Sequence, residues 1–171
     1  MKHRFIFKLA AVSLVVFIFS SPVLMADSQD SLKEMEIKGI AFDKNLQTPV
    51  VFLTDLGQNK ILPIWIGICE ARSIELSLSD VLPPRPLTYD FIAAMVRTMN
   101  AKVERIVVVD LRDEVFYAQV ELTVDGKISK IDARPSDAIA LAARVNAPIF
   151  VKQSVIDKAA LLDPNLEKRG L

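Results

Sequence analysis

The spacing of apolar and polar residues changes period along the chain, and the clearest change lies around Pro135. Ile131 and Ala133 fall on one side of an extended segment while Lys130 and Asp132 fall on the other, as expected for a half-buried strand. Proline lacks an amide hydrogen and fits the first helical position, so Pro135 ends the strand and begins a helix. The apolar residues that recur at helical spacing after it are Ala138, Ile139, Leu141, Ala142 and Val145.

The remaining apolar runs alternate with short polar turns and predict further strands. Together with the strand before Pro135, at 127–133, they are expected at residues 35–42, 49–54, 60–65, 103–111, 115–124 and 149–151. The first three follow one another through short turns, which favours an antiparallel meander. Asp125-Gly126 is a strong hairpin signal that joins two of the later strands.

Helical periodicity predicts three other helices, at residues 68–79, 88–100 and 153–160. The expected buried side of the first consists of Ile68, Ala71, Ile74 and Leu78. The second has Thr88 as its N-cap, and its expected buried stripe consists of Phe91, Ile92, Met95, Val96 and Met99. Hairpin-joined strands interrupted by helices predict an α+β fold: a single domain with a mixed, largely antiparallel sheet and three to four helices.

The first 26 residues have the pattern of a targeting segment. Lys2, Arg4 and Lys8 precede an uncharged run, and small residues near Ala26 provide a cleavage site, as in a secretory signal peptide. The chain is therefore expected to be exported, either periplasmic or secreted. An uncleaved N-terminal anchor, tethering the domain to a membrane, is the alternative. The folded domain is expected at residues 34–160 and a loosely held tail at 161–171.

Removal of this leader changes the chemistry that the chain can perform. It takes away three of the 21 basic residues and none of the 21 acidic ones, so the net charge becomes 18 minus 21, or −3. A mildly acidic domain attracts a phosphate backbone weakly. The cut also removes His3, the only histidine, and with it histidine-based catalysis. Cys69 is the only cysteine, which excludes an intramolecular disulfide, and its apolar neighbours favour a buried side chain.

Five ordered motifs resemble the bifunctional nuclease (BFN) domain family. They are Leu62-Pro-Ile-Trp-Ile-Gly67 with Glu70-Ala71, the segments 85–90 and 116–118, the segment 131–142, and Pro148-Ile-Phe-Val151. The resemblance spans most of residues 34–160. It implies an α+β domain around a mixed sheet, occurring in bacteria and plants and often dimeric, in a family named for a member with both DNase and RNase activity.

The chain departs from this family at one position of the second motif. The family commonly has Arg-Pro-x-Thr-His-Asp there, and this sequence has Tyr89 in the histidine place. Tyrosine is a poor base at neutral pH, so any chemistry that a histidine performs in relatives must be done differently here.

The candidate site residues gather in three places: the turn from Asp132 to Asp137, the entry to the second helix and the start of the first. A nuclease without histidine would bind Mg²⁺ or Mn²⁺ through carboxylates, and the expected metal ligands are Asp132, Asp137 and Asp90. The expected catalytic residues are Asp132, Asp137 and Glu70. The residues expected to hold the phosphate of a DNA or RNA substrate are Arg85, Arg134 and Ser136.

The same residues also have a purely structural interpretation. Asp137 could hold free amides at its helix start, and Asp132 could pair with Arg134. Asp90 could cap its own helix, and Glu70 could oppose a helix dipole. Two aromatic residues, Trp65 and Tyr117, could stack on bases or belong to the core.

Two hypotheses about function follow from these observations. The first is an exported nuclease that hydrolyses phosphodiester bonds in DNA or RNA, or in both, with a divalent metal held by carboxylates. The alternative is a non-catalytic binding or assembly module on the same fold. In either case a homo-oligomer, a dimer or larger, is expected. The chain has no glycine-rich phosphate loop, no Cys/His metal pattern and no serine-nucleophile elbow, so other common enzyme classes receive no support.

Overall fold

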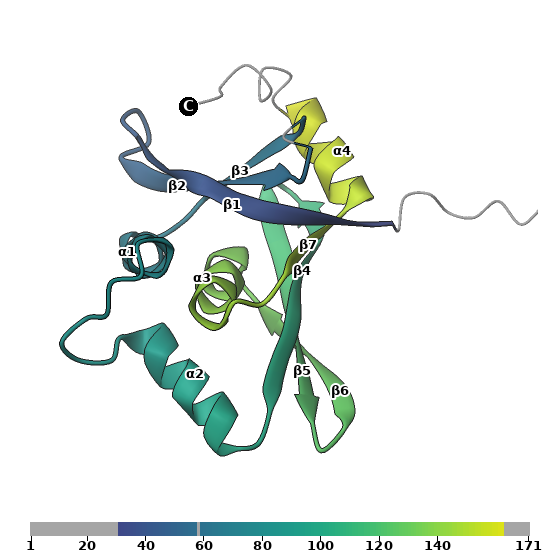
Figure 1. Cartoon of the computed structure of the whole chain (residues 1–171). Coiled ribbons are helices and arrows are strands. Elements are labelled where there is room, and N and C mark those ends of the chain that lie inside the picture. The colour runs from purple at the N-terminus through teal and green to yellow at the C-terminus, as the bar shows by residue number, and fades with distance from the viewer. Residues whose placement is uncertain (1–30, 58, 163–171) are drawn as a thin grey trace, which may run out of the picture.

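The computed structural model describes residues 31–57 and 59–162 of the chain (Figure 1). The predicted leader at 1–26 and residues 163–171 of the predicted tail lie outside these residues, whereas residues 161 and 162 of that tail end a helix. The described strands are β1 (Leu32–Asp43), β2 (Thr48–Asp55), β3 (Ile61–Trp65), β4 (Lys102–Arg112), β5 (Val115–Val124), β6 (Lys127–Ala133) and β7 (Ile149–Lys152). The described helices are α1 (Ile68–Leu78), α2 (Thr88–Thr98), α3 (Pro135–Val145) and α4 (Gln153–Leu162).

The strands form one mixed sheet in the order β3-β2-β1-β7-β4-β5-β6. Every neighbouring pair is antiparallel except β4 and β7, which run parallel. Helix α3 makes the crossover connection from the edge strand β6 to β7, which lies between β1 and β4. The predicted meander is confirmed as β1-β2-β3. Asp125 and Gly126 both have positive φ, the conformation that a tight hairpin turn between β5 and β6 requires. The predicted α+β class and mixed sheet are confirmed.

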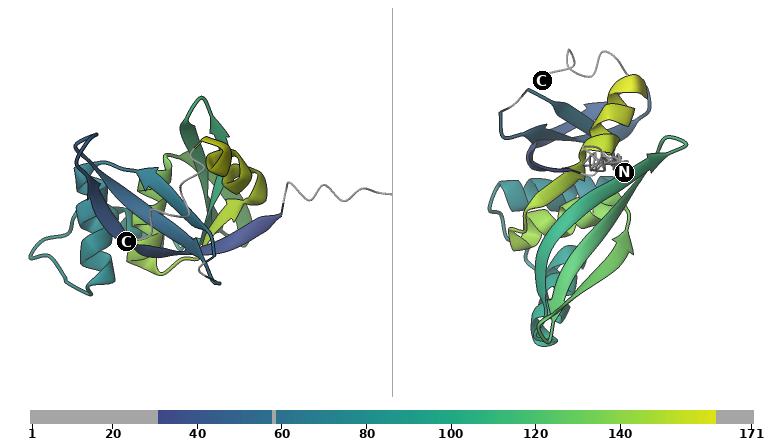
Figure 2. Two further views of the ribbon diagram at one scale, coloured as in Figure 1. Left: turned by 90° about the horizontal axis from the view of Figure 1, so that it is seen from above. Right: turned by 90° about the vertical axis from the view of Figure 1, so that its right-hand side faces the viewer.

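Helix α3 lies at the centre of the molecule. Figure 1 shows it between β1–β3 on one side and β4–β6 on the other, with α1 and α2 beside it. Ala138, Ile139 and Ala140 are completely buried, and small side chains on several sides of α3 allow α1 and α2 to pack closely against it. Figure 2 shows α4 at the end of the domain away from α2, where it packs against β4 and β7. The segment that begins at Pro135 therefore organises the core, as the sequence predicted.

The buried side of α2 differs from the prediction. Of the predicted stripe, Val96 is buried and Ile92 packs against the core, which confirms those two positions. Phe91, Met95 and Met99 are exposed, and the helix buries Tyr89 and Ala93 in their place. The helix carries two apolar stripes, and the small side chain of Ala93 with the ring of Tyr89 fits the crowded surface of α3 better than Phe91 and the methionines. Thr88 is the first helical residue, not the N-cap. Leu87 is the N-cap, and its amide donates to Oδ2 of Asp90 at 2.8 Å.

Helix α1 also corrects the sequence analysis. Ala71, Ser73 and Ile74 are buried, whereas Ile68 and Leu78, at the two ends of the helix, are exposed. Cys69 is exposed as well, so the prediction of a buried thiol was wrong. Within the described residues, no helix combines the length and the apolar character needed to cross a bilayer.

Strand β6 is an edge of the sheet, and this position explains its exposure. Its side chains from Lys127 to Asp132 are exposed, and only Ala133 is half-buried. The half-buried strand predicted before Pro135 was therefore wrong in burial, although its bounds are confirmed. In the neighbouring β5, Glu121 is buried between Arg105 of β4 and Lys130 of β6, with N···O distances of 2.7 and 3.2 Å.

Candidate functional site

Four polar side chains meet where three helices begin, and we call Glu70, Tyr89, Arg134 and Asp137 the Arg134 cluster. Glu70 lies in the first turn of α1 and Asp137 in the first turn of α3. Tyr89 is the second residue of α2, and Arg134 is the N-cap of α3. Carboxylates are favoured in these positions because the first turn of a helix presents free amide groups and a positive dipole end.

Arg134 connects two carboxylates from different helices. Its Nε lies 2.6 Å from Oδ2 of Asp137, and its Nη2 lies 3.0 Å from Oδ1 of the same residue. Nη2 also donates to Oε1 of Glu70 at 3.1 Å. Its Nη1 has no partner among the described residues, and the side chain is largely exposed. The guanidinium is thus fixed in orientation through Nε and Nη2, and in the described part of the chain only Nη1 keeps free N–H groups.

Tyr89 supports the same carboxylate from inside the protein. Its hydroxyl donates a hydrogen bond of 2.7 Å to Oδ1 of Asp137, and only 5% of its surface is exposed. Burial raises the pKa of Tyr89 well above its ordinary value, and the hydrogen bond and negative charge of Asp137 raise it further. Tyr89 is therefore a neutral hydrogen-bond donor and not a base.

Asp137 is held in its ionised form. Its partial burial acts to raise its pKa, but the hydrogen bonds from Arg134 and Tyr89 together outweigh this effect and lower the pKa below the ordinary value. The pKa of Arg134 is raised, first by its hydrogen bond to Asp137 and then by the charge of that carboxylate. The pair is consequently a fixed ion pair at neutral pH.

Gly67 leaves the space in which Glu70 reaches Arg134. This glycine is the N-cap of α1 with an ordinary extended backbone, so its conformation does not require glycine. A Cβ atom at this position would, however, overlap Oε2 of Glu70. The glycine therefore leaves room for the observed position of the Glu70 carboxylate, which would have to move if a Cβ atom were present.

The structure brings together only some of the predicted site residues. Glu70, Arg134 and Asp137 meet, but Asp132 lies on the exposed edge strand β6 and makes no side-chain hydrogen bond or ion pair in the described part of the chain. Asp90 forms an ion pair with Arg144 in the last turn of α3, with Nε and Oδ1 3.0 Å apart. The predicted pairing of Asp132 with Arg134 is replaced by the contact of Arg134 with Asp137 and Glu70. The predicted capping role of Asp90 is confirmed.

Arg85 and the expected metal ligands are also separated. Arg85 is exposed in the connector between α1 and α2 and forms no ion pair with a described residue. Among residues 31–57 and 59–162, no three His, Cys, Asp or Glu side chains come together as a metal-binding group. The three carboxylates expected to share a metal, Asp132, Asp137 and Asp90, therefore do not converge. The carboxylates that do meet are Glu70 and Asp137.

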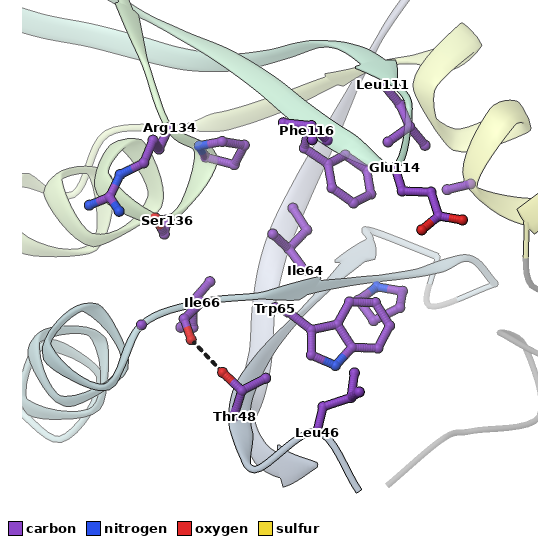
Figure 3. A pocket seen from close by; sticks show the side chains of 15 residues that line it. Leu46, Thr48, Ile64, Trp65, Ile66, Leu111, Glu114, Phe116, Arg134 and Ser136 are labelled. Carbon is purple, nitrogen blue, oxygen red and sulfur yellow. Dashed lines mark hydrogen bonds between the residues drawn. The ribbon is translucent and has the colours of Figure 1, made fainter.

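A groove of about 750 Å³ opens beside the Arg134 cluster (Figure 3). One end is formed by Arg134, Pro135 and Ser136 at the start of α3. The walls are mainly apolar, and they include Trp65 at the end of β3 and Phe116 of β5. Trp65 is 39% exposed, so the interpretation of this residue as a core aromatic was wrong. Tyr117 also lies at the surface, with its ring beneath the guanidinium of Arg112.

Sequence reasoning missed two members of the site. Tyr89 was noted only as a departure from a histidine, although an aromatic residue with a polar tip in a first helical turn can reach a neighbouring helix. Gly67 was interpreted only as a strand break. Its spacing of three residues from Glu70 was the available signal, because an N3 glutamate commonly folds back toward its N-cap.

The sequence is similar to a known protein family and to proteins of bacteria and plants. Residues 51–163 match the family described as Bifunctional nuclease domain. An uncharacterized protein of Mycobacterium tuberculosis is 39% identical over 132 residues, which cover 77% of this chain and 79% of that protein. Bifunctional nuclease 1 of Arabidopsis thaliana is 30% identical over 107 residues, or 61% of this chain and 33% of the plant protein. Bifunctional nuclease 1 of Oryza sativa subsp. japonica is 25% identical over 109 residues, with 62% and 33% covered.

Proposed function

Because the chain belongs to the bifunctional nuclease domain family, we propose that it hydrolyses phosphodiester bonds in DNA or RNA and that the Arg134 cluster is its reaction centre. The observation that carries this proposal is the fixed guanidinium of Arg134, which joins Glu70 and Asp137 beside an open groove. The two N–H groups of Nη1 have no partner among the described residues, and such an oriented guanidinium nitrogen can donate charge-assisted hydrogen bonds to phosphate oxygens. No other described group of side chains combines paired carboxylates, an arginine and an adjoining groove.

The charge of the cluster explains why a cation is part of the proposal. Two carboxylates and one guanidinium leave one net negative charge, and a phosphodiester adds another, so the substrate would be repelled in the absence of a counter-charge. Glu70 and Asp137 would hold Mg²⁺ or Mn²⁺, which commonly bind through one or two carboxylates together with substrate oxygens. When bound, such a metal stabilises the negative charge on the attacking and leaving oxygens.

The described residues take separate roles in this proposal. Nη1 of Arg134 donates to a nonbridging phosphate oxygen, while its other edge remains on Asp137. Oε2 of Glu70 has no hydrogen-bond partner among the described residues and is the oxygen that would bind the metal. The attacking water forms the new P–O bond and gives its proton to solvent, while the departing ester oxygen takes up a proton from solvent. Asp137 stays ionised and keeps Arg134 in place. Tyr89 does not touch the substrate and acts by positioning Asp137.

A cleavage assay tests this function. The purified full chain is incubated with plasmid DNA and with single-stranded RNA, in the presence of Mg²⁺ or Mn²⁺ and, in parallel, with EDTA. We expect fragments of at least one substrate with metal and none with EDTA. A preparation that is folded but inactive on both substrates would favour the non-catalytic binding module, in which the Arg134 cluster serves only to join α1, α2 and α3.

A further inference from the structure

The groove beside the Arg134 cluster has a polar end that is built for an anion. The N-terminal residues of α3 have no side-chain cap, and the amides of Ser136 and Asp137 cannot bond within the helix because four preceding residues are needed. Ser136 lines the groove and is 8% exposed, and its hydroxyl has no hydrogen-bond partner in the described part of the chain. This hydroxyl is not among the described side-chain atoms that are both buried and unpartnered, so it reaches the groove and can donate a hydrogen bond to an oxyanion bound at the helix start.

The rest of the groove is suited to a flat apolar group. Figure 3 shows Phe116 and Trp65 on different walls, with Ile64 between them. The groove volume, about 750 Å³, is in the range that holds a nucleotide-sized ligand. Glu114 lies on the Phe116 side of the groove, well away from Ser136 in Figure 3. Its charge disfavours a phosphate at that end, but its oxygens can accept hydrogen bonds from amino groups of a base.

These two ends define an orientation for one class of ligand. We propose that the groove binds a single nucleotide unit of single-stranded nucleic acid, with its phosphate at Ser136 and its base between Trp65 and Phe116. Bases stack on aromatic side chains without strong sequence preference. The groove would therefore distinguish single-stranded from duplex nucleic acid, but not one base sequence from another. A base that is paired and stacked in a duplex cannot enter unless it is flipped out, which costs free energy. This inference rests on the proposed nuclease function and specifies its substrate as single-stranded.

Trp65 supplies a direct reporter because it is the only tryptophan in the chain and lines the groove. The purified full chain is titrated with 5′-AMP while tryptophan fluorescence is recorded. AMP has no phosphodiester bond, so binding is measured without cleavage. We expect saturable quenching, with at least fivefold weaker binding of adenosine, which lacks the phosphate, and of ribose 5-phosphate, which lacks the base.

Two variants assign the binding to the two ends of the groove. Ser136→Ala should weaken AMP binding about fivefold, the loss that corresponds to one hydrogen bond, and should leave adenosine binding unchanged. The matched control is Ser129→Ala, on the exposed strand β6, which should bind AMP as the parent does. Phe116→Leu keeps an apolar side chain but removes the stacking face, and it should weaken both AMP and adenosine.

The outcomes separate this inference from the nuclease proposal. Saturable AMP binding that is sensitive to Ser136 but accompanied by no cleavage would support the nucleotide groove and remove the nuclease function. Cleavage of duplex and single-stranded RNA at equal rates, with no effect of AMP on fluorescence, would overturn the groove and leave the nuclease function standing. Quenching by a fatty carboxylate such as laurate, but not by AMP, would also overturn it, because the groove would then accept apolar anions in place of nucleotides.

Discussion

The hydroxyl of Tyr89 donates a 2.7 Å hydrogen bond to Asp137, a residue 48 positions later in the chain. This contact joins the first turn of α2 to the first turn of α3. It also defines what Tyr89 does in this chain. Because its pKa is raised by burial and by Asp137, Tyr89 remains protonated and orients the carboxylate that holds Arg134.

Removal of this hydroxyl should cost stability at neutral pH. Tyr89→Phe eliminates a hydrogen bond to an ionised carboxylate, and we expect the free energy of unfolding to fall by about 1–2 kcal/mol. The measurement is urea unfolding followed by circular dichroism at pH 7. Tyr117→Phe is the matched control, since Tyr117 is the other tyrosine and its hydroxyl forms no hydrogen bond with a described residue. Equal destabilisation by the two variants would contradict the proposed role of Tyr89.

The same pair of variants predicts a dependence on pH. The pKa of Asp137 is lowered in the folded state, so its interactions stabilise the protein above its unfolded pKa of about 3.9 and are lost as the pH falls through the folded value. The stability difference between the parent and Tyr89→Phe should therefore shrink as the pH is lowered below about 4. Unfolding series at pH 7, 5 and 3 measure this difference, and a difference that grows on acidification would contradict the assignment.

The geometry of Arg134 should matter as well as its charge. Lysine keeps the charge but cannot contact Asp137 through two parallel hydrogen bonds and also reach Glu70. Arg134→Lys should therefore reduce the rate of phosphodiester cleavage by about tenfold or more. Arg85→Lys provides a control, because Arg85 is exposed and forms no ion pair with a described residue. The prediction fails if both substitutions reduce cleavage equally.

Gly67 gives a test of Glu70 that does not alter its carboxylate. Gly67→Ala is allowed by the backbone conformation, but its Cβ overlaps Oε2 of Glu70 and must push this side chain away from Arg134. We expect lower cleavage with little change in the unfolding midpoint. The control is Gly57→Ala, whose Cβ would meet only the side chains of Asn59 and Asp55 in a surface turn. Unchanged cleavage by Gly67→Ala would show that the position of Glu70 is unimportant.

Glu121 should contribute to stability through a second, separate ion pair. Its hydrogen bond from Arg105 lowers its pKa, against the opposing effect of burial, and Lys130 adds to the lowering. Glu121→Gln should reduce the free energy of unfolding by about 2 kcal/mol at pH 7, and this loss should diminish below about pH 4.3, where glutamate is protonated in the unfolded chain. Glu104→Gln is the control in the same unfolding experiment and should lower the midpoint much less, because its ion pair with Lys102 is exposed to solvent.

The sequence predicted the elements of the fold well because their signals are local. Asp125-Gly126 and Pro135 determine a turn and a helix start by their own backbone chemistry, and both predictions are confirmed. The buried side of each helix was predicted less well, because it depends on which of its apolar stripes packs against another element. The exposed Phe91 and Met95 of α2 have the same periodicity as a core face, and only the position of α3 decides between the two faces.

Only those parts of the candidate site that have a local signal in the sequence were predicted. The turn around Arg134 was identified from residues that are close in sequence, and Glu70 from its place in a helix start. Their meeting, and the support from Tyr89, come from the packing of α1 and α2 on α3, which leaves no local signal. Asp132 appeared central because it is near Arg134 in sequence, but the strand direction places it on the open edge of β6.

A comparison of Asp137→Asn with Asp132→Asn decides whether the Arg134 cluster performs phosphodiester hydrolysis. Both changes remove one carboxylate from the same short segment, and circular dichroism confirms that each variant is folded at the assay temperature. With Mg²⁺ or Mn²⁺ and single-stranded RNA, we expect Asp137→Asn to lose about a hundredfold or more of the cleavage rate and Asp132→Asn to retain it. Full activity of Asp137→Asn, or loss of activity confined to Asp132→Asn, would contradict the account.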